Sequence, residues 1–151
     1  MGDELASANV NRSYSLAGTS IAIFTFVLFF MYPRFVSGEI NGLLFQGTLV
    51  VMGVATFSFV FASFYYYCVS LGSRIDDIER ALCFRRGDRF WLLGDILLFL
   101  VPSLILFTVR LLAVGSAWFA LWLVYLLFVI RYFPKVQTRA ENSSRGQARA
   151  G

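Results

Sequence analysis

The chain has 151 residues, of which 58% are hydrophobic and only 15% are charged, and its net charge is +4. Soluble domains are nearer half apolar and a quarter charged, so this composition excludes an ordinary soluble domain and predicts a single membrane domain. Histidine is absent, and Cys68 and Cys83 match no metal or redox spacing. We therefore expect no enzyme, no metal site and no cofactor.

Residues 1–14 form a polar N-terminal tail, and residues 15–134 form the membrane domain. Charged residues mark the ends of its helices, because each costs about 2.5–3.5 kcal/mol at the centre of an inserting helix. Crossing a bilayer core of about 30 Å takes about 20 helical residues. We place four transmembrane helices at about residues 15–33, 42–69, 90–110 and 113–133. The predicted fold class is all-α, an integral membrane four-helix bundle.

The first predicted helix is expected to end at Pro33, because the residue before a proline is disfavoured in helical geometry. Ser37-Gly38 and Asn41-Gly42 predict the turn that follows. The third and fourth helices are separated only by a short stretch around Gly115. Such a short connection predicts that these two helices are antiparallel neighbours.

The connection between the second and third spans predicts a short cytoplasmic interfacial helix. Ile75, Ile78 and Leu82 recur at helical spacing and form one apolar face. We expect this helix to lie on the membrane surface and to turn at Gly87 into the third span. The same helix could instead dock a cytoplasmic partner, or act as a lever that gates the bundle.

The distribution of basic residues predicts the orientation in the membrane. All Lys and Arg residues except Arg34 and Arg110 fall in the N-terminal tail, the connection of residues 70–89, the inner end of the fourth span (Arg131), or the chain that follows it. The positive-inside rule therefore places both termini in the cytoplasm of a multi-pass protein of the cell inner (plasma) membrane. The C-terminal tail, residues 135–151, is basic and polar, which predicts disorder. It has no aromatic residue for stacking on bases, so no nucleic-acid partner is expected.

Asp95 is the sharpest candidate for a functional residue, because a carboxylate inside a span is costly and needs a partner. It could bind a proton or a cation. It could also form a structural ion pair with Arg131 at the inner end of the fourth span, or with Arg89 on its own helix.

Other polar residues of the spans have two interpretations each. Glu39 and Arg110 lie at the outer boundary, where they could form an ion pair or a charged ring at the mouth of an oligomeric pore. Tyr65, Tyr66 and Tyr67 are typical of interface anchors, with a cation or ligand cage as the alternative.

Thr48, Ala55 and Ala62 recur every seven residues in the second span. Small residues let membrane helices approach closely, so this seam predicts either internal packing or self-association.

Two functions are compatible with these features. The first is a non-enzymatic subunit that assembles in the lipid bilayer with itself or with a larger membrane complex. The second is a small homo-oligomeric ion channel with the pore between protomers, lined by residues such as Asp95, Thr48, Arg110 or Glu39.

Overall fold

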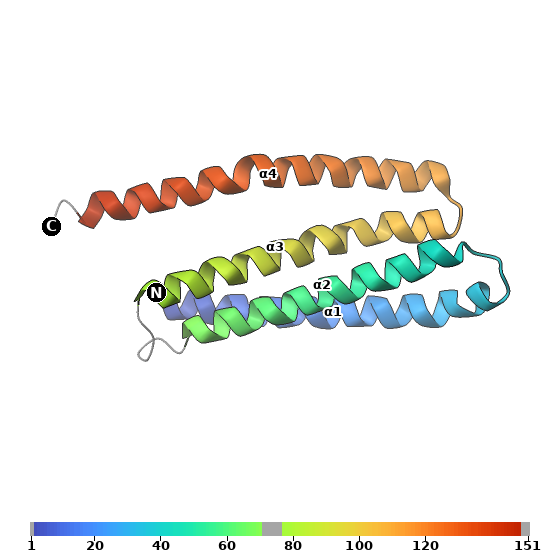
Figure 1. Ribbon diagram of the computed structural model, residues 1–151, viewed down its shortest axis with the longest axis horizontal. Coiled ribbons are helices and arrows are strands. Elements are labelled where there is room, and N and C mark those ends of the chain that lie inside the picture. Colours follow the sequence, from blue (N-terminus) through green and yellow to red (C-terminus); the bar gives the residue numbers. More distant parts are fainter. Residues whose placement is uncertain (1, 71–76, 149–151) are drawn as a thin grey trace.

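Four long helices make up the described part of the chain. The computed structural model describes the backbone of residues 2–70 and 77–148, and the side chains of residues 7–70 and 78–131. The helices are α1 (Gly2–Val36), α2 (Gly42–Ser70), α3 (Asp77–Thr108) and α4 (Leu112–Ala148). They run antiparallel, with both chain termini at one end of the molecule, here called the terminal end (Figure 1). The α1–α2 and α3–α4 turns lie at the opposite end, here called the turn end.

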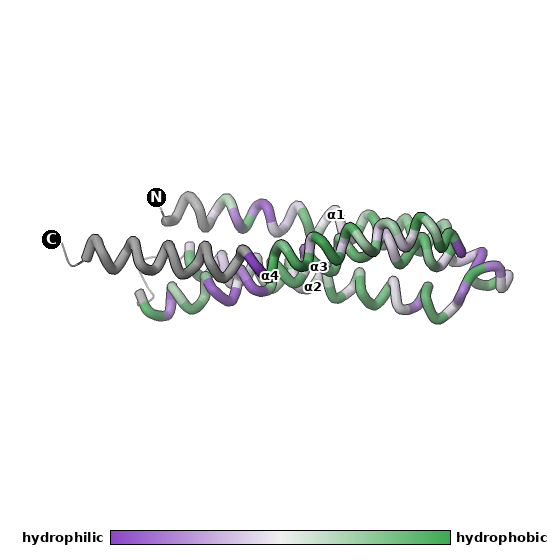
Figure 2. Tube along the Cα trace, turned by 90° about the horizontal axis from the view of Figure 1, so that it is seen from above, coloured by the Kyte–Doolittle hydropathy of each residue, from purple (hydrophilic) through white to green (hydrophobic). Residues whose placement is uncertain are grey.

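Each helix contains a segment that is long and apolar enough to cross a membrane. These segments are Ser7–Val36, Gly42–Ser70, Ile78–Thr108 and Leu112–Arg131. Figure 2 shows hydrophobic residues along the middle of the four helices and hydrophilic residues toward both ends. The prediction of an all-helical protein with four apolar helices is therefore confirmed, and the architecture is consistent with a multi-pass membrane protein.

The packing is centred on α2, which lies between α1 and α3, while α4 packs chiefly against α3 (Figure 1). The buried face of α2 alternates large residues (Phe45, Met52, Phe59 and Tyr66) with small ones (Thr48, Ala55 and Ala62). Spacings of three and four residues place all of them on one side of a helix. Large side chains of this face fill the space between helices, and the small ones let the backbones approach.

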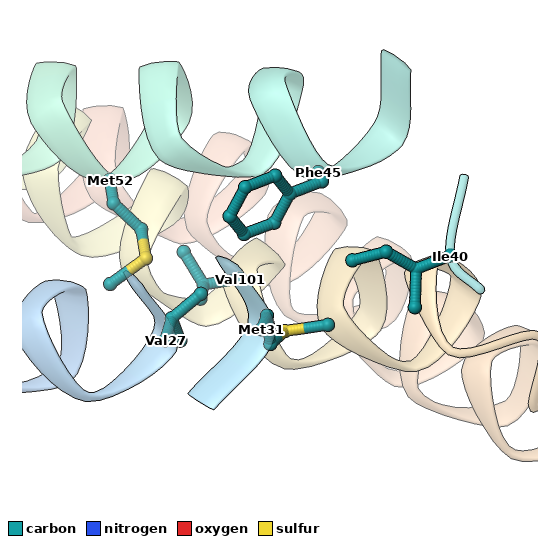
Figure 3. Packing of buried hydrophobic residues seen from close by; sticks show 6 residues of the cluster. All are labelled: Val27, Met31, Ile40, Phe45, Met52 and Val101. Carbon is teal, nitrogen blue, oxygen red and sulfur yellow. The ribbon is translucent and has the colours of Figure 1, made fainter. Parts of the chain in front are cut away.

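A cluster of buried apolar side chains joins the first three helices near the turn end. It consists of Val27, Met31, Ile40, Phe45, Met52 and Val101 (Figure 3). Met52 of α2 lies among residues of α1 and α3, and its unbranched side chain suits an irregular space of this kind.

The separate interfacial helix predicted between the second and third spans is wrong. α3 begins at Asp77 and continues without a break to Thr108, so residues 77–89 form its first turns. Ile78 and Leu82 of the predicted apolar face are exposed, and Ile75 lies outside the described residues. Gly87 is buried in the helix, where a Cβ atom would come within 3.0 Å of the Tyr66 ring. The glycine is thus a site of close helix packing. In the sequence, a glycine of this kind cannot be told from one that marks a turn.

The helices also extend beyond the predicted boundaries at the terminal end. α1 begins at Gly2, within the predicted N-terminal tail of residues 1–14. α4 runs as a helix to Ala148, through most of the predicted tail of residues 135–151.

At the turn end, α1 ends at Val36 and not at Pro33, which lies inside the helix. Gly38, at φ 75°, closes the helix: its N–H donates to the Phe35 carbonyl (3.1 Å), and the Glu39 N–H donates to the Arg34 carbonyl (3.0 Å). This pair of hydrogen bonds is a Schellman motif. α1 accommodates Pro33 and continues for three more residues, so the glycine, and not the proline, decides where the helix ends.

Asn41 starts α2 as its N-cap. Its side-chain oxygen accepts hydrogen bonds from the N–H groups of Leu43 (3.1 Å) and Leu44 (3.2 Å). These donors have no carbonyl partner within the helix, so the cap satisfies groups that would otherwise be left at a membrane boundary.

The close approach of α2 and α3 can be tested at Gly94, where an added Cβ would lie 2.9 Å from Cε1 of Phe59. We expect Gly94→Ala to destabilise the protein by about 1–3 kcal/mol, because an added methyl group overpacks the interface. Thermal unfolding in detergent, followed by circular dichroism, measures the change. Gly47→Ala is the matched control, since a Cβ there meets nothing within 4 Å. Equal stability of the two variants would contradict this account of the interface.

Candidate functional site

Asp95 of α3 faces α4, where the Tyr125 hydroxyl donates a hydrogen bond to its carboxylate. The same tyrosine ring packs against Phe99, one turn further along α3, with the ring centroids 5.0 Å apart. A carboxylate inside a span needs a polar partner, and Tyr125 supplies one.

Neither arginine predicted as a partner of Asp95 forms an ion pair with it among the described side chains. Arg131 and Arg89 are both exposed. Arg89 lies six residues before Asp95, and Arg131 lies six residues after Tyr125. Six residues correspond to a rotation that leaves each arginine about 120° around its helix from the α3–α4 contact. Both therefore lie away from the face on which Asp95 finds its partner.

Two further hydrogen bonds join α3 and α4. The Trp122 indole N–H donates to the Ile96 carbonyl (2.9 Å), and the Ser103 hydroxyl donates to the Gly115 carbonyl (3.1 Å). A Cβ at Gly115 would come within 2.9 Å of the Phe107 ring, so the helices are close where they leave the turn. α4 is thus fixed to α3 by polar contacts between Gly115 and Tyr125, in the part of α4 that is nearer the turn end.

The contribution of Tyr125 can be measured by removing its hydroxyl. We expect Tyr125→Phe to lower the stability of the bundle by about 1–2 kcal/mol, because the variant leaves a carboxylate without its donor inside the span. Equilibrium unfolding in mixed detergent micelles reports the difference. Tyr67→Phe serves as the control, since Tyr67 is an exposed tyrosine of α2. A loss no larger than that of the control would mean that the hydrogen bond is not important for stability.

A second polar site lies at the terminal end, between α1, α2 and α3. The Tyr66 hydroxyl of α2 donates to Oδ1 of Asp88 on α3 (2.6 Å). The neighbouring Gly87 has no side chain, which lets the Tyr66 ring lie against the α3 backbone. The Phe84 ring meets the Tyr66 ring edge-on at 5.7 Å. The tyrosine is therefore held in place by α3 on two sides.

α1 contributes a cation to this site. The Arg12 guanidinium lies 4.6 Å from the ring centroid of Trp91 on α3, a cation–π geometry. A cavity of about 200 Å³ is lined by Asn9, Arg12, Tyr66, Asp88 and Trp91, here called the terminal-end cavity. It combines an acid, a base, an amide and two aromatic side chains.

Residues of the terminal-end cavity were not singled out as a site by the sequence. Tyr66 belongs to the triplet that is predicted to anchor the interface, and Asp88 carries no prediction of its own. One signal was available: Tyr66 continues the seven-residue repeat of Phe45, Met52 and Phe59, which predicts that it is the inward tyrosine of the triplet.

The small-residue seam of α2 lies inside the chain. Thr48, Ala55 and Ala62 have exposed fractions of 1%, 0% and 0%. The Thr48 hydroxyl donates to the Leu44 carbonyl of its own helix (2.8 Å). This face is occupied by the neighbouring helices of the same chain, as the internal-packing interpretation requires.

Glu39 and Arg110 are both exposed at the turn end, and no ion pair joins them in the described part of the chain. Arg110 has an unusual backbone, with φ 63°. Its N–H donates to the Phe107 carbonyl (3.1 Å), and the Leu111 N–H donates to the Leu106 carbonyl (2.9 Å). Arg110 therefore occupies the Schellman position at the end of α3 that Gly38 occupies at the end of α1.

Replacing Arg110 separates its backbone role from its charge. A side chain in the left-handed region costs about 1–2 kcal/mol, so we expect Arg110→Gly to stabilise the protein by about 1 kcal/mol. Arg110→Ala removes the charge but keeps the Cβ atom, and it should show no such gain. Thermal unfolding of both variants gives the comparison, and equal shifts would assign the effect to the guanidinium.

Among the residues that the structure describes, no three His, Cys, Asp or Glu side chains gather to hold a metal ion. Comparison with protein-family models, curated proteins and solved structures gives no match.

Proposed function

We propose that this protein is a non-enzymatic subunit that assembles with other transmembrane helices, from further copies of itself or from a larger membrane complex. The observation that carries the proposal is an open side of the bundle, between α1 and α4. α1 packs chiefly against α2 and α4 chiefly against α3, so the first and last helices do not close a ring.

The open side forms an apolar groove of about 520 Å³. Ile23 of α1 and Trp118 of α4 lie on its two sides, and Pro102 of α3 lies between them. The remaining lining residues are Leu98, Phe99, Val101, Ile105 and Leu106. The groove therefore lies within the membrane-spanning part of the chain, where a partner would be a helix.

A groove of this shape supports association for a physical reason. Helices in a bilayer gain no hydrophobic energy from meeting, since lipid tails are equally apolar, and they associate through close van der Waals contact. A groove with walls on two sides offers a partner helix more such contacts than a convex surface does. The outward side of α4 is a further apolar surface, with Val124, Leu127 and Ile130 exposed.

The contacts within the chain favour this function over the channel. A pore between protomers was expected to be lined by residues such as Thr48 and Asp95. Thr48 is buried between helices of one chain, and the Asp95 carboxylate is engaged by Tyr125. Both groups would have to leave these partners to line a pore.

We also propose that the terminal end faces the cytoplasm of a cell inner membrane. Support comes from the basic residues: among those on the described helices and turns, Arg34 and Arg110 alone belong to the turn end, and the others lie toward the opposite end. Excess Lys and Arg on one side is the usual mark of the cytoplasmic face.

Assembly can be tested by filling the groove. Leu98→Trp places a large ring in it, so we expect the assembled species to be lost in favour of the single chain, while helix content stays the same. Native mass spectrometry of protein extracted with its surrounding membrane measures the assembly. Leu43→Trp is the matched control, because Leu43 is 81% exposed on α2. A wild-type chain that is extracted alone and monomeric would contradict the proposal.

A further inference from the structure

The terminal-end cavity lies at the depth of lipid headgroups. Arg12 and Arg34 are the charged residues that bound the apolar part of α1, and they are 34 − 12 = 22 residues apart. At 1.5 Å per residue, this is about 33 Å, close to a hydrocarbon core of about 30 Å. Arg12 therefore lies at the boundary of the core, and Asp88, which lines the same cavity, lies with it.

The cavity carries one charge of each sign, and the two do not pair with each other. Asp88 uses Oδ1 to accept from Tyr66, which leaves Oδ2 for another donor. The Arg12 guanidinium lies over the Trp91 ring, and no ion pair joins it to Asp88 in the described side chains. The donors of Arg12 thus stay available to a ligand.

We propose that the terminal-end cavity binds the headgroup of a phospholipid that carries both a phosphodiester and a primary ammonium group, as phosphatidylethanolamine does. The ammonium donates to Oδ2 of Asp88. The phosphodiester accepts from the Arg12 guanidinium and from the Asn9 amide. Arginine suits this role because its planar donors match phosphate oxygens.

Other headgroups match the cavity less well. A phosphoglycerol headgroup can donate hydroxyl hydrogen bonds, but it has a net negative charge and no cation to set against the Asp88 carboxylate. A phosphocholine headgroup has no N–H to donate to the Asp88 carboxylate. A metal cation or free ammonium ion would satisfy Asp88 but would be repelled by Arg12. The ligand that satisfies both charges is a zwitterion with N–H donors.

The experiment measures binding of three lipids to the full chain in detergent by native mass spectrometry. The lipids share acyl chains and differ in headgroup: phosphatidylethanolamine, phosphatidylcholine and phosphatidylglycerol. We expect phosphatidylethanolamine to bind about tenfold more tightly than the other two, as one charge-assisted hydrogen bond predicts. Asp88→Asn should abolish the preference for phosphatidylethanolamine over phosphatidylcholine. Arg12→Gln should weaken the binding of both of these lipids.

Arg34→Gln, at the turn end of α1, is the matched control and should leave the preference unchanged. Circular dichroism checks that each variant is folded. If Asp88→Asn unfolds, Arg12→Gln carries the test, because Arg12 is exposed and its removal leaves the Tyr66–Asp88 hydrogen bond in place. Equal binding of the three lipids, an unchanged preference in Asp88→Asn, or an unchanged affinity for phosphatidylethanolamine in Arg12→Gln would overturn the proposal. Equally tight binding of soluble phosphoethanolamine would overturn the assignment to a lipid.

Discussion

The close approach of α1 and α3 to the buried face of α2 is the constraint on which the rest of the structure depends. Helices in a bilayer cannot associate by burying apolar surface away from water, so their surfaces must be complementary in shape and pack closely. α2 provides the fit by alternating small residues such as Ala55 and Ala62 with large ones such as Phe59. α3 has a glycine opposite each of two large rings of α2: Gly94 lies against the Phe59 ring, and Gly87 lies against the Tyr66 ring.

The same fit brings the polar groups at the terminal end together. Because Gly87 admits the Tyr66 ring, the Tyr66 hydroxyl reaches Asp88 on the next residue of α3. α1, packed on the other side of α2, adds Arg12 to the same cavity. The charged cavity is therefore a consequence of helix packing, and a mutation that separates α2 from α3 would remove it without touching a charged residue.

α4 is attached in a different way. It contacts chiefly α3, and hydrogen bonds from Tyr125 and Trp122 take the place of the interdigitated packing around α2. Such bonds hold a helix along one line and leave its other sides uncovered. The bundle therefore stays open between α1 and α4. The Asp95 carboxylate takes part in holding α4 against α3.

The sequence by itself determined the number of helices, their approximate positions and the face of α2 on which small residues allow close packing. These follow from the cost of charge in a bilayer and from residue spacing, which are local properties. Only the tertiary structure decided the roles of Pro33, Gly87 and Asp95. In the sequence, Pro33 and Gly87 both resemble helix breaks. α1 instead ends at the cap that Gly38 forms, and Gly87 lies within α3, where its missing side chain leaves room for the Tyr66 ring. The partner of Asp95 depends on the rotation of α4 about its axis, which is set by contacts between helices far apart in the chain.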